Sequence, residues 1–339
     1  MGNVTMKEIA RRANVSTATV SRVINNKGPI SEITKSKVLA AIETLEYHPN
    51  LVARSLKNST THTISLVVSD ISNAYFAKLS LAVEQVIHPK GYTLIVCSTG
   101  DSPEKEAGDL KNLLEKKVDG IILNTTGGNN EYISALSRKA PLVLCNRKID
   151  NFDINCDFID NDNYTASYKL TSNLIEQGHK KIGIVNGPMI VSSAQERFEG
   201  FKDAMNKISI NITQDYEYYF DARYDEQSGY EVAKKVASLE NKPTALVIMN
   251  GPMTIGALRY FRSQNIRIPE DISIVSATDI INQDLFYIEL NAAIMDPWII
   301  GKRAAEMLIE RIEQDNKIPN REVRFYPEIR IGNSTKIIG

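Results

Sequence analysis

Cysteine, histidine and tryptophan are scarce in this sequence of 339 residues, which has three Cys, four His and one Trp. The cysteines are odd in number, form no Cys-x-x-Cys pair, and lie in or beside runs typical of buried strands: Cys97, Cys145 and Cys156. They therefore predict buried free thiols in a reducing compartment, not a disulfide framework. The histidines are scattered and show no metal-binding spacing: His48, His62, His88 and His179.

Long apolar runs and catalytic motifs are also missing. No run reaches the ~18 residues that a membrane helix needs, and a capped helix beginning at Thr5 leaves no room for a signal peptide. No glycine-rich phosphate loop follows the first predicted strand, and no Ser or Cys lies in a nucleophile elbow. We therefore expect a cytoplasmic protein without membrane contact, catalytic residues, metal or cofactor.

Residues 160–163, Asp-Asn-Asp-Asn, faintly resemble a calcium-binding loop. The sixth position of such a loop would be Thr165, and no Glu stands at the twelfth. Asn and Asp are common in ordinary turns, so we interpret this segment as a strand-to-helix turn.

Charge is unevenly distributed along the chain. The net charge of −1 would by itself argue against a nucleic-acid partner. Residues 1–60, however, hold nine Lys/Arg and four Glu, which gives them +5 and leaves −6 for the rest. A basic head on an acidic body is the pattern expected when only the head meets phosphate.

The basic head contains a pattern of two short helices over residues 5–25. Thr5 and Glu8 are spaced as a capping box, Asn14 and Val15 make a turn, and Ser16 is placed to cap the second helix. Helical spacing predicts an inward face with Ile9, Ala10, Ala13, Val20, Val23 and Ile24. The second helix keeps an outward face of Thr17, Ala18, Ser21, Arg22 and Asn25.

This outward face suits the major groove of DNA. Arg can donate two hydrogen bonds to guanine, small residues permit close approach, and a methyl group can contact thymine. We interpret the pattern as a helix-turn-helix whose second helix reads the bases. The alternative is an ordinary helical hairpin with an exposed polar face.

A third helix is predicted from Ser31, and the chain leaves it at Pro49. Its expected apolar side comprises Ile33, Val38, Ala41, Ile42 and Leu45. Residues 1–48 thus form a small all-α head. Residues 49–62 are a linker, in which 50–57 have helical propensity but are too short to form a stable helix alone. Because its apolar residues have no evident core, we predict a hinge helix that forms on DNA; the alternative is packing on the body.

From residue 63 onward, β-rich runs alternate with helical segments. Such alternation predicts parallel sheets with helices on both faces. We assign two Rossmann-like α/β lobes: 63–161 plus 292–322, and 162–291 plus 323–339. Ligands of such sheets bind beyond the carboxyl ends of the strands, so a cleft between the lobes is the expected site for a small polar ligand such as a sugar.

Several motifs resemble the lac repressor/galactose repressor family of bacterial transcription regulators. They are VTMKEIARRANVSTATVSRVINN and LEYHPNLVARSLK near the N-terminus, and SNAYFAKL, KKVDGIIL, LIEQGHKKIGIVNGP, RFEGF and IPEDISIVS in the body. The resemblance covers essentially the whole chain and implies a body similar to type I periplasmic binding proteins. It further implies a repressor of a carbohydrate-related operon that binds palindromic double-stranded operator DNA as a homodimer and responds to a small-molecule effector.

The resemblance also implies roles for single residues. Base contacts fall on Thr17, Ala18 and Arg22; phosphate contacts on Thr5, Ser16, Ser21, Asn25 and Tyr47; minor-groove contacts of the hinge on Ala53 and Leu56. Effector-binding positions are Tyr75, Phe76, Asn146, Arg147, Ser193, Arg197, Tyr224, Asn250, Thr278 and Asp296. For each of the effector positions, the alternative is a packed or salt-bridged rim residue.

Three departures from the family pattern bear on the ligand. An Asp-Asp pair is here Thr278-Asp279, an Asn-Asp pair is Asn250-Gly251, and Gln-Pro is Asp296-Pro297. Fewer carboxylates, with Arg147, Arg197 and Arg223 near the expected cleft, favour an anionic effector such as a sugar acid or phosphosugar over a neutral sugar.

Oligomeric state and control leave further expectations. The tail after Thr335 lacks a leucine heptad, so we predict a dimer and not a tetramer. One alternative is the same DNA-binding regulator controlled by a partner protein; a remote alternative is a solute-binding protein.

Overall fold

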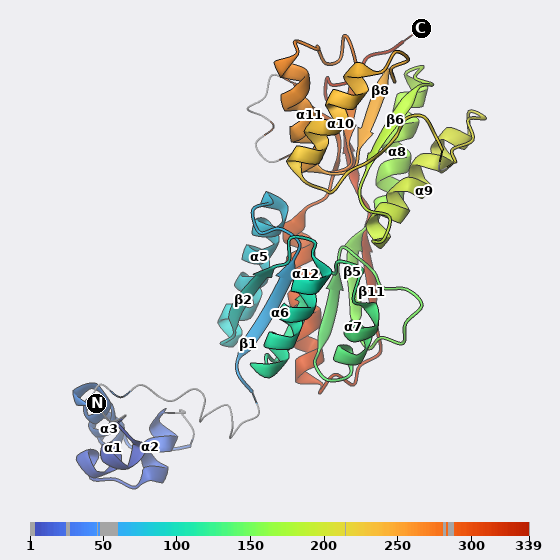
Figure 1. The fold of residues 1–339 in the computed structure, drawn as a ribbon. Helices are drawn as coiled ribbons and strands as arrows, with labels where there is room; N and C mark the ends of the chain where they lie inside the picture. Colours follow the sequence, from blue (N-terminus) through green and yellow to red (C-terminus); the bar gives the residue numbers. More distant parts are fainter. Residues whose placement is uncertain are drawn as a thin grey trace. The chain divides into compact units, whose positions relative to one another are not determined.

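The structure is a computed structural model that describes residues 4–24, 28–45, 47, 60–213, 215–280, 283 and 288–338 (Figure 1). Contacts divide the chain into two units, residues 1–61 and 62–339. The first unit is the head and the second is the two-lobed body.

The head contains α1 (Met6–Ala13), α2 (Thr17–Ile24) and α3 (Glu32–Thr44). The backbone N–H and hydroxyl of Thr5 donate to Oε2 of Glu8 at 2.6 and 3.0 Å. The N–H of Thr19 donates to Oγ of Ser16 at 3.1 Å, so Ser16 caps α2 as predicted. Asn14 adopts a left-handed conformation with φ of 53°, which ends α1 and makes the tight turn between the two helices.

The head core agrees with the predicted inward faces, with one correction. The buried members are Ile9, Ala10, Ala13, Val20, Val23, Val38, Ala41 and Tyr47. Ile33 was expected among them but is 72% exposed. Five residues of helix separate it from Val38, a rotation of about 140°, which turns Ile33 away from the side of α3 that packs on the core.

The N-terminal lobe has a wholly parallel six-stranded sheet in the order β11-β5-β4-β3-β1-β2. Its strands are β1 (Thr63–Val68), β2 (Thr93–Ser98), β3 (Gly120–Leu123), β4 (Leu142–Cys145), β5 (Asp157–Asn161) and β11 (Glu322–Phe325). One face packs on α5 (Ala74–Ile87), which continues into the short η1 (His88–Lys90), and on α12 (Pro297–Glu313). The other face packs on α6 (Pro103–Glu115) and α7 (Asn130–Ser137).

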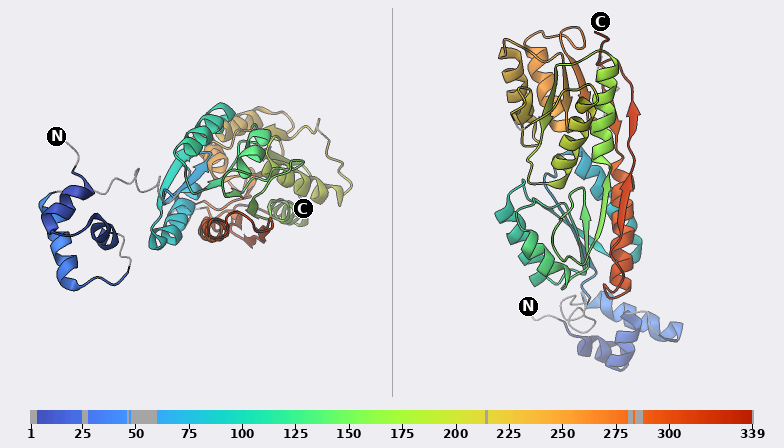
Figure 2. Two further views of the ribbon diagram at one scale, coloured as in Figure 1. Left: turned by 90° about the horizontal axis from the view of Figure 1, so that it is seen from below. Right: turned by 90° about the vertical axis from the view of Figure 1, so that its right-hand side faces the viewer.

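The C-terminal lobe repeats this architecture with the sheet order β12-β10-β9-β8-β6-β7 (Figure 2). Its strands are β6 (Ile182–Asn186), β7 (Tyr219–Asp221), β8 (Ala245–Ile248), β9 (Ser273–Ser276), β10 (Asn291–Ile294) and β12 (Glu328–Arg330). Among the strands that the structure describes in this lobe, only β10 and β12 pair in antiparallel fashion. Its helices pack in pairs, α8 (Asn163–Glu176) with α9 (Ser192–Asn206) and α10 (Glu226–Ser238) with α11 (Gly251–Ser263).

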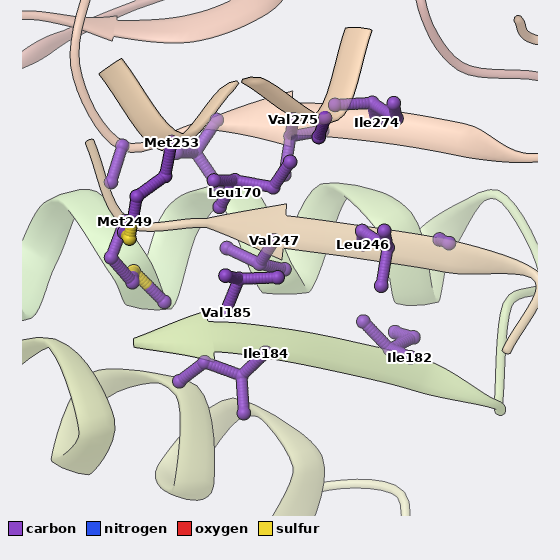
Figure 3. Packing of buried hydrophobic residues seen from close by; sticks show 14 of the residues in the cluster. Leu170, Ile182, Ile184, Val185, Leu246, Val247, Met249, Met253, Ile274 and Val275 are labelled. Atoms are coloured by element: carbon purple, nitrogen blue, oxygen red, sulfur yellow. The ribbon is translucent and has the colours of Figure 1, made fainter. Parts of the chain in front are cut away.

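Apolar side chains of the C-terminal strands fill the space between the sheet and its helices. Figure 3 shows Val185, Leu246 and Val247 on adjacent strands, with Leu170 and Met253 approaching from helices. Parallel strands covered on both faces are expected to be continuously apolar, and the burial of β6 and β8 agrees.

The lobe boundaries differ from the predicted ones at two crossings. The prediction placed residues 292–322 in the N-terminal lobe, but β10 belongs to the C-terminal sheet and β11 to the N-terminal sheet. The sequence of β10, Asn-Ala-Ala-Ile, is too short and too poor in β-branched residues to be predicted as a strand. The chain therefore crosses between the lobes after β5, between β10 and α12, and between β11 and β12.

The remaining structural expectations concern thiols, metals and membranes. Cys97, Cys145 and Cys156 are free, and the last two are buried. Within the described ranges, no group of three or more His, Cys, Asp or Glu side chains could hold a metal ion. None of the described helices combines the length and the apolar character that a membrane crossing requires. Asp162 caps α8 by accepting from the N–H of Thr165 at 2.8 Å. Residues 160–163 thus form the junction between strand and helix, as predicted, with 160 and 161 ending β5 and 163 beginning α8.

Candidate functional site

The outward face predicted for α2 is exposed at three of the four residues that the structure describes. Thr17, Ala18 and Arg22 are exposed, whereas Ser21 is partly buried. Val20 and Val23 bury the opposite side of the helix in the head core. Asn25, Ala53 and Leu56 lie outside the described residues.

The predicted phosphate contacts differ in how they are placed. Thr5 and Ser16 are exposed at helix N-termini, where their hydroxyls take part in capping. Backbone N–H groups at such ends suit a phosphate. Tyr47 is packed in the head core at 9% exposure. All three DNA contacts remain predictions.

The two lobes contact each other through loops that follow strands. The N–H of Lys148, after β4, donates to Oγ of Ser192 at the start of α9 at 2.7 Å. Gly127, with φ of 83°, lies so close to the opposite lobe that a Cβ there would be 2.9 Å from the carbonyl oxygen of Ile190. Both contacts occur at carboxyl ends of strands, the edge where sheets of this type bind ligands.

Arg147 is the buried cation of the N-terminal lobe at this edge. Its Nη1 donates to Oδ1 of Asp101 at 2.6 Å and to the carbonyl oxygen of Thr125 at 2.9 Å. Asp101 follows β2, Thr125 follows β3 and Arg147 follows β4, so the ends of three strands of one sheet converge on one guanidinium. Asp101 offsets the charge of Arg147, but its side chain is 33% exposed while that of Arg147 is only 7% exposed.

Arg197 on α9 is a buried cation of the C-terminal lobe. Its Nε donates to Oδ1 of Asn163 at 2.9 Å, and its Nη1 donates to the carbonyl oxygen of Met249 at 2.7 Å. In the part of the chain that the structure describes, Arg197 forms no ion pair and its Nη2 donates no hydrogen bond. A buried cation held only by neutral acceptors favours an anion beside it.

Tyr224 lies between these two cations. Its ring centroid is 5.8 Å from Cζ of Arg147 and 5.6 Å from Cζ of Arg197, within the range of cation–π attraction. A side chain at Gly187 would overlap this ring, so glycine is needed for the close approach. Nδ2 of Asn250 donates to the carbonyl oxygen of Tyr224 at 2.9 Å, which anchors the residue in its left-handed conformation.

Burial disfavours negative charge around this cluster. The hydroxyl of Tyr75 donates to Oδ1 of Asn146 at 2.9 Å, and burial raises the pKa of Tyr75 well above its ordinary value. Burial also raises the pKa of Asp160, and the negative charge of the nearby Glu196 raises it further. The neutral forms of these groups are therefore favoured, and the guanidinium groups dominate the local potential.

The structure thus brings Asn146, Arg147, Arg197, Tyr224 and Asn250 into one constellation, together with Tyr75. We call Arg147, Tyr224 and Arg197 the arginine–tyrosine cluster. The guanidinium and amide groups of the constellation are suited to binding a small polar or anionic molecule, and the ring of Tyr224 offers a face for that molecule to stack on.

Two of the other predicted effector residues, Phe76 and Asp296, have structural contacts of their own. Phe76 on α5 is buried in the core of the N-terminal lobe, and its ring lies edge to face with that of Tyr75, with 5.3 Å between the ring centroids. Asp296 caps α12 and pairs with Lys78 at 3.0 Å. Ser193 is buried, whereas Thr278 is partly buried beside Gly251.

Sequence reasoning missed the roles of Asp101, Thr125 and Asn163. All three follow predicted strands, so the strand-end rule could have found them. Their partners are 46, 22 and 34 positions away in the sequence, which no local pattern reveals. Arg223, expected near the cleft, is instead exposed and pairs with Asp225 at 3.4 Å.

Comparisons with known proteins cover both units. Residues 5–50 match the family model for bacterial regulatory proteins of the lacI family, and residues 61–326 match that for periplasmic binding proteins and the sugar-binding domain of the LacI family. The chain is 34% identical over 334 residues to the HTH-type transcriptional repressor PurR of Vibrio vulnificus (strain CMCP6), covering 98% of this chain and 99% of that protein. It is 33% identical over 338 residues to the repressor of the same name in Haemophilus influenzae (strain PittEE), with 98% and 99% coverage.

A solved structure shares the fold along the whole chain. The lac repressor dimer bound to operator and the anti-inducer ONPF superposes with a TM-score of 0.84 at 23% identity, covering 99% of this chain and 100% of that one.

Proposed function

Because the chain belongs to the LacI family of bacterial regulatory proteins, we propose that it represses transcription under the control of a small anionic effector bound at the arginine–tyrosine cluster. The chain is a DNA-binding transcriptional repressor of that family, and its relatives are repressors, not enzymes. Operator DNA as the partner implies action in the bacterial cytoplasm.

The DNA-binding part of the proposal uses α2 as the recognition helix. Arg22 would bind guanine, with Thr17 and Ala18 beside it. Two heads of a homodimer would occupy the two halves of a palindromic operator. The similar lac repressor structure is a dimer on its operator, which supports this arrangement.

The buried Arg197 carries the effector part of the proposal. Arg197 is only 9% exposed. Its guanidinium has neutral acceptors and, in the described part of the chain, no ion pair. A carboxylate or phosphate would supply the missing negative charge and accept from Nη2. Asn146 and Asn250 offer amides that could orient hydroxyl groups, and Tyr224 offers a ring face.

A sugar acid or phosphosugar fits this chemistry, which would connect the repressor to a carbohydrate-related operon. The family model for residues 61–326 is described as a sugar-binding domain, which supports that class. The name of the PurR relatives mentions no ligand.

Control of DNA binding would follow from the arrangement of the lobes. The effector would contact cations from both lobes, so it binds more tightly to one lobe arrangement than to another. Such a difference in affinity shifts the population of the two arrangements, and the linker to the head transmits the change.

Calorimetry on the full chain tests the effector class. Gluconate or glucose 6-phosphate should bind with a saturable signal, neutral glucose should bind weakly or not at all, and Arg197→Lys should reduce anion binding. Tight binding of glucose without binding of either anion would overturn the anionic class. Binding of none of them would favour the alternative in which a partner protein controls the repressor.

A further inference from the structure

The junction of β5 and α8, where the chain passes from one lobe to the other, places a buried amide at the first residue of α8. Asn163 is 1% exposed. Its Oδ1 accepts from Nε of Arg197 at 2.9 Å, and its Nδ2 donates to Oδ2 of Asp160 at 2.7 Å. The amide nitrogen also lies 3.3 Å from the carbonyl oxygen of Asn161 and 3.5 Å from Oε2 of Glu196.

These neighbours determine which way the amide faces. A guanidinium can only donate, so the oxygen of Asn163 must face Arg197. Acceptors surround the other end, so the NH2 group must face Asp160 and Glu196. Reversing the amide would set donor against donor at Arg197, which makes one orientation strongly preferred.

The amide connects groups that belong to different lobes. Asp160 is on β5 of the N-terminal sheet, and Arg197 is on α9 of the C-terminal lobe. The crossing between β11 and β12 is connected to the same residues, because Arg324 on β11 donates to Oε1 of Glu196 at 2.8 Å. The direction of the Arg197 guanidinium is therefore tied to two of the three crossing segments.

We propose that Asn163 is a positioning residue that holds Arg197 in the orientation needed by the anionic effector and links that orientation to the arrangement of the lobes. The inference rests on the proposed function of Arg197. Nε and Nη1 are held by Asn163 and Met249, which leaves Nη2 for the ligand. Bending at the turn moves Asp160 relative to Arg197 and misdirects the guanidinium, and by reciprocity a bound anion favours the aligned arrangement.

Anion binding by paired variants tests this role in the full-length chain. Calorimetry with glucose 6-phosphate, gluconate and inorganic phosphate should show about tenfold weaker binding for Asn163→Ala, the loss expected when one charge-assisted hydrogen bond is misdirected. In an Arg197→Lys background, Asn163→Ala should cause no further loss, because its effect operates through the guanidinium. A merely structural role would weaken binding equally in both backgrounds.

Glu199→Gln is the control on α9, the helix that carries Arg197. Glu199 pairs with Lys202 at the surface at 3.1 Å, and its side chain is 52% exposed. Removal of this carboxylate should leave anion binding unchanged. A loss equal to that of Asn163→Ala would mean that any change around α9 weakens anion binding, which would overturn the positioning role.

A second variant, Asn163→Asp, keeps the side-chain shape and provides a pH profile. The new carboxylate would still accept from Arg197, but it would neutralise that cation and oppose Asp160 and Glu196. The charged and titratable groups around it are Asp160 on β5, Glu196 and Arg197 on α9, Arg324 on β11, Tyr75 on α5 and Cys145 on β4. Anion affinity should therefore be lowest above neutrality and recover as the pH falls and the carboxylates share protons, whereas the unaltered chain should lack this recovery.

The outcomes separate the two proposals. If no probe binds the unaltered chain, or Arg197→Lys binds as well as it, the anionic site is overturned and the inference with it. If Arg197 is required but Asn163→Ala binds normally, and Asn163→Asp shows no recovery at low pH, only the positioning role is overturned.

Discussion

Replacement of Asp101 by Asn should destabilise the N-terminal lobe and, at the same time, strengthen anion binding. The carboxylate of Asp101 lies 2.6 Å from Nη1 of Arg147. The variant keeps an oxygen that can accept a hydrogen bond but removes the charge. Arg147 would then be a buried cation without its carboxylate partner.

The magnitude follows from the burial of the two side chains. At 2.6 Å and an effective dielectric constant of about 20, the Coulomb attraction is roughly 6 kcal/mol, most of which the desolvation of Arg147 offsets. Breaking a fully buried pair costs about 3–5 kcal/mol, and breaking an exposed pair about 0–1 kcal/mol. With Arg147 buried and Asp101 one-third exposed, the expected loss in the free energy of unfolding is about 2 kcal/mol.

Urea unfolding measures this loss. Trp298 is the only tryptophan and lies on α12 of the N-terminal lobe, so its fluorescence reports on the lobe that contains Arg147. The control is Asp271→Asn, which removes an exposed pair with Arg267 and should change stability by less than about 1 kcal/mol.

Anion binding supplies the second half of the test. Because the variant frees the charge of Arg147, glucose 6-phosphate should bind more tightly and restore part of the lost stability through ligand linkage. Unchanged stability would refute the structural role of the ion pair. A loss of stability that no anion relieves would refute the placement of the effector beside Arg147.

Three further predictions concern the operator, acid stability and lobe contact. Arg22→Ala should weaken operator binding by about 1–3 kcal/mol and relax specificity at one base pair per half-site, as measured by binding to operator variants; unchanged specificity would mean that α2 does not read the bases there. The pKa of Asp157 would be raised by burial, but hydrogen bonds from Arg321 and Arg311 outweigh burial and lower it. The stability that ionised Asp157 contributes is therefore fully present above the ordinary Asp pKa and is lost as the pH falls through the lowered pKa. The urea midpoint of the unaltered chain should thus drop below about pH 4. The midpoint of Asp157→Asn should be lower at pH 7 and should change less with pH in acid. Gly127→Ala should open the lobes and raise the radius of gyration in X-ray scattering, whereas Gly100→Ala, with φ of 62° and free space around it, should not; equal values for both would contradict the contact with Ile190.

Local features of the fold were predictable from the sequence. The caps at Thr5 and Ser16 depend on residues only three positions apart, and the structure contains both. The alternation of strands and helices was predictable for the same reason, because helical and strand periodicities extend over a few residues. The exposure of Ile33 shows the limit of this reasoning, since the side that a helix buries depends on where its neighbours lie.

The constellation of candidate ligand-binding residues was only partly predictable. Arg197 and Tyr224 were named from the family resemblance, but their approach to Arg147 depends on loops from both lobes. The roles of Asp101 and Asn163 come from hydrogen bonds that span 46 and 34 residues. Residues 160–163, which the sequence predicted to be an ordinary strand-to-helix turn, also bring Asn163 into contact with Arg197.

The sequence by itself determined the helix-turn-helix head, its basic charge and the parallel architecture of the two lobes, because capping, charge and periodicity act within short segments. Only the tertiary structure decided where the chain crosses between the lobes, since β10 and β11 are defined by the sheets that they join. It also decided that one tyrosine lies between two buried arginines, because that contact exists only when loops distant in the sequence converge at the ends of two sheets.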